Sequence, residues 1–227
     1  MRLALIHSPF VGPSSWRRTA EALAATGVEA VAADYGGVRP PDWYDGAAHR
    51  IAAALPGFEP LALAVHSGAG GLVPALADAL GARASAFLFV DAVLPYPGQR
   101  WLDTAPPALA DRMREIAEEG VLPPWDTWFG RGAIETLIID PALRAAFCAD
   151  LPRVPLAYLE AVAPGGEAWR NRRAAYLQLS GPYAAEAGAA EALGWIVRRE
   201  QLHHLAMLTH PDRLAGILAE MADELAA

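Results

Sequence analysis

The stretch PLALAVHSGAGGLVPALADAL, residues 60–80, constrains the fold more than any other part of the chain. An apolar, strand-like run stops at Ser67, passes through the small residues Gly-Ala-Gly-Gly, and resumes with the apolar spacing of a helix. A strand that turns directly into a helix strains its corner residue, and bulky neighbours would collide with the helix that follows. The sequence therefore predicts a strand–helix corner that exposes the hydroxyl of Ser67 at the carboxyl end of a strand.

The rest of the chain repeats this alternation of a short apolar run and a longer stretch with helical spacing. The short runs are apolar along their whole length, which is typical of parallel strands covered by helices on both faces. We therefore predict an α/β fold with a mostly parallel sheet of about six strands flanked by helices. Because the first strand begins at residue 2 or 3, no antiparallel pair is expected before it. The expected strands are residues 3–7, 29–34, 60–66, 86–91, 175–179 and 195–200.

Between residues 96 and 174 the strand–helix alternation stops. Prolines are frequent there, the helical patterns are short, and tryptophan and phenylalanine accumulate. We interpret residues 96–174 as a helical cap or lid inserted into a core domain that comprises residues 1–95 and 175–227. Trp125 and Trp128 of the insertion either line an apolar substrate pocket or fill a small core of the lid itself.

Composition and charge exclude several classes of partner. The formal net charge of −8 argues against nucleic acid or an anionic membrane as the main partner. No segment approaches the roughly 20 apolar residues of a membrane helix, and the apolar run after Arg2 is too short for a signal peptide. Cys148 is the single cysteine, so neither an intrachain disulfide nor a cysteine metal cluster is possible. These features predict a cytoplasmic protein.

A glycine-rich turn after a strand also occurs as an ordinary strand–helix turn or as a cradle for an anion. The chain has no Gly-Lys-Ser/Thr, and Gly68 and Gly70 lack the third glycine of a dinucleotide-binding turn. We therefore expect no cofactor and no metal ion. Two further segments favour a catalytic serine over these alternatives.

These two segments resemble the α/β-hydrolase family. LIHSPFVGPSSW, residues 5–16, is similar to the family's loop in which a histidine precedes a glycine and a tryptophan. LHHLAMLTHPDRLA, residues 202–215, is similar to the segment with the catalytic histidine, and alignment on Met207 gives that role to His204. The run FVDAVLPYPG is closest to the compact esterase and hydroxynitrile-lyase-like branch. The resemblance spans the chain and implies the α/β-hydrolase fold, with Ser67 on the nucleophile corner.

The implied chemistry uses Ser67 as nucleophile and His204 as base. A serine hydroxyl becomes a good nucleophile only when a neighbouring base takes its proton, and imidazole does this near neutral pH. We expect Ser67 Oγ to lie about 2.6–3.5 Å from a ring nitrogen of His204. The other histidines are expected to support this pair or to lie at the surface: His203 beside the base, His7 and His66 behind the loop and the corner, and His49 and His210 exposed.

The carboxylate that should orient His204 departs from the family pattern. The resemblance places it just after the strand at 175–179, where this chain reads SGPYAAEAG, with Pro182 near the expected aspartate. Asp91, at the end of the preceding strand, and Glu186, a few residues late, are both candidates. We place Asp91 ahead of Glu186 because of its strand-end position, and a backbone carbonyl or water is the third alternative.

The expected oxyanion hole departs from the pattern as well. One donor is the N–H of Gly68, directly after the nucleophile. The resemblance assigns the second donor to Pro9, but proline has no N–H. Either Phe10 donates instead, or the hole lacks one donor, which costs about 3–4 kcal/mol of transition-state stabilisation.

Three functions fit these residues. The first is a serine hydrolase of the esterase, thioesterase or lactonase type, acting through an acyl-enzyme on a small hydrophobic acyl or polyketide-like substrate. The second is a lyase, cyclase or decarboxylase of secondary metabolism, which uses His204 as acid and base without hydrolysis. The third is a small-molecule-binding protein on the same scaffold. In each case the partner is a small hydrophobic molecule, and the chain is a monomer or a homodimer.

Overall fold

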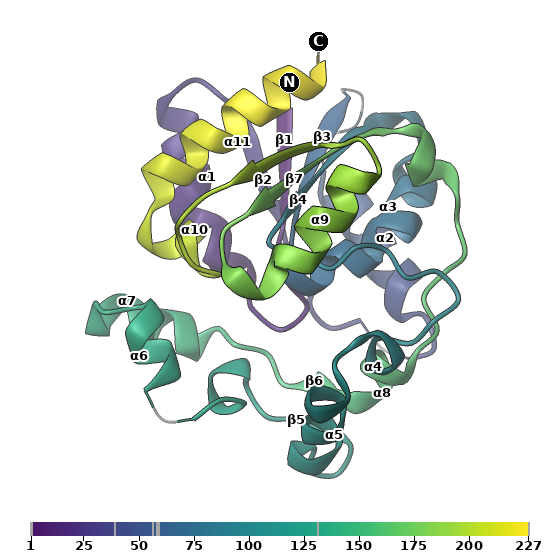
Figure 1. The fold of residues 1–227 in the computed structure, drawn as a ribbon, viewed down its shortest axis with the longest axis vertical. Coiled ribbons are helices and arrows are strands. Elements are labelled where there is room, and N and C mark those ends of the chain that lie inside the picture. The colour runs from purple at the N-terminus through teal and green to yellow at the C-terminus, as the bar shows by residue number, and fades with distance from the viewer. Residues whose placement is uncertain (1, 39, 56, 58–59, 131, 227) are drawn as a thin grey trace.

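The computed structural model describes residues 2–38, 40–55, 57, 60–130 and 132–226 (Figure 1). Its centre is a six-stranded sheet in the order β2-β1-β3-β4-β7-β8, in which every neighbouring pair is parallel. This confirms the predicted α/β fold, with strand ends displaced by one or two residues. The strands are β1 (Arg2–Ile6), β2 (Ala30–Ala33), β3 (Leu61–His66), β4 (Ala84–Val90), β7 (Arg173–Gln178) and β8 (Ile196–Arg199).

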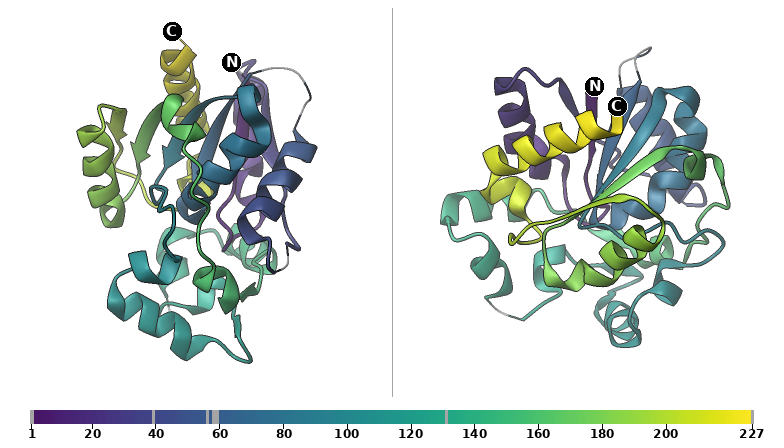
Figure 2. Two further views of the ribbon diagram at one scale, coloured as in Figure 1. Left: turned by 90° about the vertical axis from the view of Figure 1, so that its right-hand side faces the viewer. Right: turned by 45° about the horizontal axis from the view of Figure 1, so that its top comes forward.

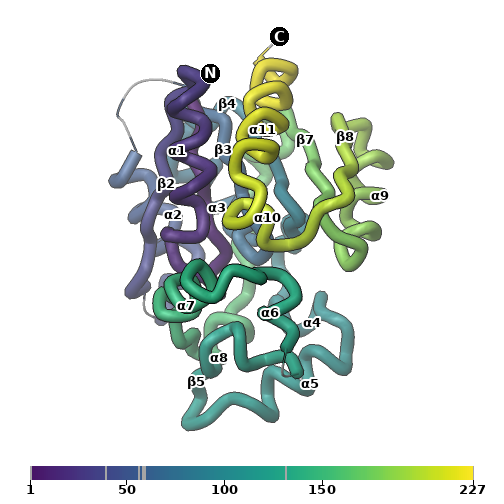
Figure 3. The backbone as a smooth tube through the Cα atoms, turned by 90° about the vertical axis from the view of Figure 1, so that its left-hand side faces the viewer, coloured from purple at the N-terminus to yellow at the C-terminus, as the bar shows by residue number. Residues whose placement is uncertain are grey.

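Helices cover both faces of the sheet, as the uniformly apolar strands predict. In β3, Leu63 and Val65 pack into the core beneath α2, α3 and α9, whereas Ala62 and Ala64 face the opposite core beneath α1 and α11. Figure 3 shows α1 and α11 side by side on the latter face. The helices are α1 (Arg17–Ala25), α2 (Trp43–Ala54), α3 (Val73–Leu80), α9 (Ala184–Ala192), α10 (Ala206–Thr209) and α11 (Pro211–Ala226).

The segment between β4 and β7 forms a cap below the carboxyl ends of the strands, and both chain termini lie at the opposite end of the sheet (Figures 1 and 2). It is built from short helices and one antiparallel pair of two-residue strands, which the sequence did not predict. The cap therefore covers the sheet edge where the Ser67 corner lies. Its elements are α4 (Trp101–Thr104), α5 (Pro107–Ile116), β5 (Val121–Leu122), α6 (Ala133–Leu137), α7 (Pro141–Ala149), β6 (Val154–Pro155) and α8 (Leu156–Glu160).

Candidate active site

Ser67 lies at the corner between β3 and the 3-10 turn Ser67–Leu72 that leads into α3. Its φ of 55° is a left-handed conformation that a residue with a side chain rarely adopts. The small residues after it are required by close packing. A Cβ on Gly70 would lie 1.8 Å from the carbonyl oxygen of Val93, and one on Gly71 would lie 2.6 Å from Tyr96 Oη. The backbone is therefore strained at Ser67, and close packing leaves no room for a side chain at Gly70 or Gly71.

His204 lies on the loop before α10 and hydrogen-bonds the carboxylate of Asp91. The distance from His204 Nδ1 to Asp91 Oδ2 is 3.0 Å. Asp91 follows β4 directly, has a φ of 43°, and is fully buried. Because a carboxylate accepts this bond, His204 carries its proton on Nδ1, which leaves Nε2 as the acceptor nitrogen.

The protein surrounds Asp91 with donors. Its Oδ1 accepts the backbone N–H groups of Leu179 at 2.7 Å and Ser180 at 3.1 Å, both just after β7. Its Oδ2 accepts the hydroxyl of Ser180 at 2.5 Å in addition to the ring of His204. Four donors on two oxygens suit an ionised carboxylate, which only accepts. Asp91 is thus fixed by the neighbouring strand as well as by its own.

Two further histidines hold the loop of His204. His66, the last residue of β3, donates from Nε2 to the carbonyl oxygen of His204 at 3.0 Å. The pKa of His66 lies well below its usual value because the ring is buried. His203 accepts the N–H of Leu205 on Nδ1 and contacts Thr209 Oγ1 at 2.8 Å through Nε2. Both rings occupy the supporting positions expected of them. His49 and His210 are exposed, also as expected.

Tyr183, which no sequence pattern indicated, takes the place expected for His204 beside the nucleophile. Its hydroxyl lies 3.2 Å from Ser67 Oγ. Its ring is parallel to that of His204, with an interplanar angle of 6° and 5.0 Å between centroids. Within the described chain, no hydrogen bond joins Ser67 to His204, so the expected contact is not formed in this structure. In the sequence, Tyr183 is marked only by its place in the segment SGPYAAEAG, where the carboxylate was expected.

Glu186, the other candidate acid, lies in the first turn of α9 and makes no hydrogen bond to His204 in the described structure. Its side chain lines the same cavity as Ser67 and His204. Oε2 is buried and has no hydrogen-bond partner. Burial, with a smaller contribution from the charge of Asp91, raises the pKa of Glu186 above its usual value. Asp91, rather than Glu186, is the carboxylate that contacts His204.

The loop after β1, which carries Pro9 and Phe10, packs against the corner at Gly68. A Cβ on Gly68 would lie 3.1 Å from the ring of Phe10 and 3.2 Å from Pro9 Cδ, so the two segments touch. The N–H of Gly68 belongs to the first turn of the 3-10 segment, where N–H groups have no partner within the helix. The N–H of Phe10 makes only a long contact of 3.4 Å, to Ser8 Oγ.

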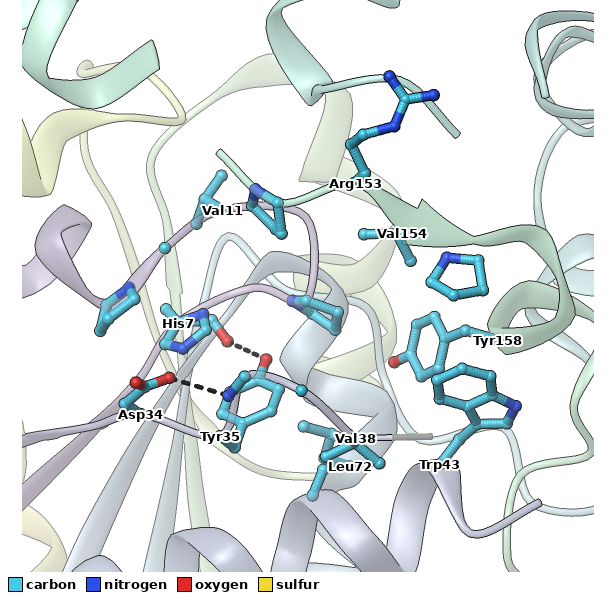
Figure 4. A pocket seen from close by; sticks show the side chains of 18 of the residues that line it. His7, Val11, Asp34, Tyr35, Val38, Trp43, Leu72, Arg153, Val154 and Tyr158 are labelled. Atoms are coloured by element: carbon cyan, nitrogen blue, oxygen red, sulfur yellow. Dashed lines mark hydrogen bonds between the residues drawn. The ribbon is translucent and has the colours of Figure 1, made fainter. Parts of the chain in front are cut away.

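His7 and Tyr35 support this loop from a second cavity, of about 340 Å³, shown in Figure 4. The two rings stack with 4.3 Å between centroids. Tyr35 donates its hydroxyl to the carbonyl oxygen of His7 at 2.6 Å, and His7 Nδ1 donates to the carbonyl oxygen of Ser8 at 2.8 Å. Burial lowers the pKa of His7. The predicted role of His7 in fixing the loop fits these contacts.

A cavity of about 560 Å³ lies over Ser67 and His204 and is roofed by the cap. Trp125 and Trp128 line it, as does Phe10. Phe10 packs edge-on against Trp128 with 5.0 Å between centroids, and Trp125 lies 6.3 Å from the ring of His204. The cap aromatics therefore form apolar walls beside the nucleophile.

Two kinds of feature are absent from the described residues. No group of three or more histidine, cysteine, aspartate or glutamate side chains in the described ranges is arranged to hold a metal ion. No helix in the same part of the chain is both long and apolar enough to cross a membrane.

Solved structures resemble this one over nearly their whole length. No protein-family model and no curated protein matches the sequence. An extracellular α/β-hydrolase from a Paenibacillus species is 18% identical, with a TM-score of 0.79 over 97% of this chain and 98% of that chain. A pyrethroid hydrolase from Sphingobium faniae is 17% identical, with a TM-score of 0.74 over 98% and 97%. Methylketone synthase I of tomato is 14% identical, with a TM-score of 0.72 over 99% and 98%.

The parallel sheet, the corner at Ser67 and these likenesses agree with one another. A strained serine after β3, between a loop that follows β1 and a histidine near the C-terminus, is the chain order that the resemblance in the sequence implied. The chain has the α/β-hydrolase fold.

Proposed function

We propose that this protein is a serine hydrolase that cleaves an ester, thioester or lactone of a small hydrophobic substrate through an acyl-enzyme. The observation that carries the proposal is the convergence of three side chains at the carboxyl edge of the sheet. Ser67 sits strained at its corner, His204 lines the same cavity, and Asp91 holds the far nitrogen of His204. Strained residues persist where the surrounding structure holds them, and they cluster at active sites.

In the proposed reaction, Ser67 Oγ first leaves the hydroxyl of Tyr183 and turns toward His204. His204 Nε2 takes the hydroxyl proton while Oγ attacks the substrate carbonyl carbon. The tetrahedral intermediate collapses, the bond to the leaving group breaks, and His204 returns the proton to the departing oxygen or sulfur. Water then repeats the cycle on the acyl-enzyme and releases the acid. Asp91 keeps the proton on Nδ1 and stabilises the imidazolium formed in each half.

The negative charge that develops on the carbonyl oxygen needs donors that are already in place. The N–H of Gly68 and the N–H of Phe10 supply them in this proposal. Pro9, the residue before Phe10, cannot contribute because proline has no N–H. The weak 3.4 Å contact between Phe10 N and Ser8 Oγ leaves the Phe10 N–H available to a stronger acceptor.

The cavity supports a hydrophobic substrate because its walls are mainly aromatic and aliphatic side chains. The structural neighbours support ester chemistry: they include a pyrethroid hydrolase and polyneuridine aldehyde esterase. At 17% and 15% identity they support only a reaction class.

The direct test is covalent labelling with a fluorophosphonate probe, followed by peptide mass spectrometry. The expected result is one adduct on Ser67 in the wild-type protein and none in S67A. S67A should also lose hydrolysis of short aryl esters, falling by about 10⁶-fold toward the background rate. An unlabelled Ser67, in a protein that binds aryl esters without hydrolysing them, contradicts the proposal.

A non-hydrolytic lyase or decarboxylase is the second candidate, and one observation favours it. Ser67 Oγ is bonded to Tyr183 rather than to His204. In such an enzyme, His204 moves a proton and Ser67 serves only to bind the substrate. One neighbour, methylketone synthase I of tomato, was solved with beta-ketoheptanoate, which makes beta-keto acids suitable probes. If S67A still converts a beta-keto acid while H204A does not, the second candidate replaces the first.

A further inference from the structure

The second cavity, which lies between the cap and the loops after β1 and β2, has no part in the proposed reaction (Figure 4). No residue in the described part of the chain lines both this cavity and the one over Ser67. The loop after β1 divides them, since Pro9 lines the second cavity and Phe10 lines the catalytic one. A molecule in the second cavity is therefore separated from the nucleophile by that loop.

Tyr158 of the cap presents an unpaired hydroxyl to the second cavity. Figure 4 shows the hydroxyl pointing into the cavity, although the residue as a whole is only 5% exposed. The hydroxyl makes no hydrogen bond with any described residue, and the fold does not enclose it completely. His7 Nε2, in contrast, is enclosed completely, so no ligand can reach it. Because buried polar side chains nearly always have partners, the Tyr158 hydroxyl leaves a hydrogen bond for a ligand to make.

The walls around this hydroxyl are apolar. They include Val38, Leu72, Val154 and Trp43, and the Trp43 ring packs edge-on against Tyr158 with 6.0 Å between centroids. An apolar cavity of about 150 Å³ takes up benzene, so a cavity of about 340 Å³ has room for one ring or two. The volume thus suits a compact ring compound.

The charged side chains of the second cavity lie on its solvent side. Asp34, Asp150 and Arg153 are exposed, and together they carry both signs. Each carboxylate already accepts a backbone N–H: Asp34 accepts that of Gly36 at 2.8 Å, and Asp150 accepts that of Ser14 at 3.2 Å. An ionic ligand beside the tyrosine hydroxyl would give up its hydration without a charged partner at that depth. The placement of the charges therefore favours a neutral ligand.

We propose that the second cavity binds a neutral ring compound that carries a hydroxyl or carbonyl group, with that group hydrogen-bonded to Tyr158. A tyrosine hydroxyl both donates and accepts, so it pairs with either group. The ring of the ligand packs against Trp43 and the aliphatic side chains, which removes apolar surface of both partners from water. This site goes beyond the proposed hydrolase function and does not depend on it.

Titration of methyl-labelled protein, followed by NMR, reports on each cavity separately. Val38, Leu72 and Val154 carry methyl groups in the second cavity, and Leu109 and Leu137 carry them in the catalytic one. The probes are p-cresol, p-xylene (in which a methyl group replaces the hydroxyl), p-toluate and p-methylbenzylammonium. We expect p-cresol to shift the signals of the second cavity and to bind there about 2- to 10-fold more tightly than p-xylene, through one neutral hydrogen bond. Both ions should bind there more weakly than p-cresol.

Y158F and Y183F form a matched pair of variants. Y158F removes the hydroxyl of the second cavity and should bring the affinities of p-cresol and p-xylene there within about twofold of each other. Y183F removes a hydroxyl from the catalytic cavity instead and should leave the preference at the second cavity unchanged. Shifts confined to the methyl groups of the catalytic cavity overturn the proposed site. Equal binding of p-cresol and p-xylene to the wild type, a preference that survives in Y158F, or tighter binding of either ion overturns the proposed ligand class.

Discussion

Asp91 Oδ2 lies 3.0 Å from His204 Nδ1, although the two residues are 113 positions apart in the chain. Asp91 directly follows β4, a central strand of the sheet, and His204 follows β8, the strand at one edge. The parallel order of β4, β7 and β8 brings these two ends to the same side. The left-handed backbone at Asp91 and the N–H groups of Leu179 and Ser180 fix the carboxylate in that direction.

The first prediction concerns Asp91. D91N should lower kcat for an aryl ester by about 10⁴-fold, because an amide cannot keep the base in its reactive tautomer. E186Q should have a far smaller effect on the same ester, since Glu186 does not contact His204. Steady-state kinetics on both variants measures this difference. Urea unfolding must accompany it, because the NH₂ group of the new amide would face donors that now meet a carboxylate.

If D91N loses activity only in proportion to the fraction of the protein that is unfolded, the triad assignment has no support. In a variant that remains folded, near-normal turnover contradicts it. A Ser67–His204 dyad would then describe the site better.

The second prediction concerns the glycines of the corner. G70A should lower the free energy of unfolding by about 3 kcal/mol, since its Cβ would lie 1.8 Å from a backbone oxygen that cannot move alone. G216A is the matched control. It lies in α11 with nothing within 4 Å of the added Cβ, and should stabilise the protein by about 0.5–1 kcal/mol. Urea denaturation measures both, and a G70A variant as stable as the wild type would contradict the close packing of the corner against Val93.

The sequence predicted the fold well because the fold depends on patterns that local residues carry. The uniformly apolar runs located six strands, and the Gly-Ala-Gly-Gly sequence after Ser67 located the corner. Both features follow from constraints on the backbone. A strand that is covered on both faces needs apolar side chains along its whole length, and a crowded corner needs small ones. The predicted order of Asp91 over Glu186 also agrees with the contact to His204, because it rested on where parallel strands end.

The contacts within the site could not be predicted in the same way. Tyr183 reaches Ser67 only because a 3-10 turn after β7 directs its ring across the sheet edge. Nothing in the local sequence fixes that direction. The partners of Asp91 at Leu179 and Ser180 are backbone N–H groups, which every residue except proline has. Such contacts depend on the register of neighbouring strands, which the residues of a single sequence do not reveal.

The third prediction concerns Tyr183. Burial raises the pKa of its hydroxyl, so Tyr183 stays protonated and competes with His204 for Ser67 Oγ. Y183F removes that competitor while keeping the ring against His204. One neutral hydrogen bond contributes about 0.5–1.5 kcal/mol, so labelling by a fluorophosphonate should become about 2- to 10-fold faster. Slower labelling would instead show that Tyr183 assists the attack. Y44F, which removes a hydroxyl that bonds Tyr96 instead of Ser67, serves as the control.

The last prediction concerns the stability of the fold in acid. His66 is buried against Trp16 and His204, and its pKa lies well below the usual value because burial disfavours the charged ring. The unfolded chain therefore binds a proton below about pH 6.5 that the folded chain does not, so stability falls as the pH falls through that region. The slope approaches about 1.4 kcal/mol per pH unit for each such histidine. Burial lowers the pKa values of His7 and His203 as well, so three rings contribute.

Urea unfolding between pH 7.5 and 5 measures this slope. H66Q keeps an N–H donor for the carbonyl oxygen of His204 but cannot titrate, so it should reduce the acid slope by up to about 1.4 kcal/mol per pH unit. Its stability at pH 7.5 is compared separately, because the smaller side chain also changes packing. H49Q, at an exposed position, should leave the slope as it is in the wild type. If H66Q and the wild type lose stability in parallel as the pH falls, His66 is not kept neutral by its burial, and the acid sensitivity has another source.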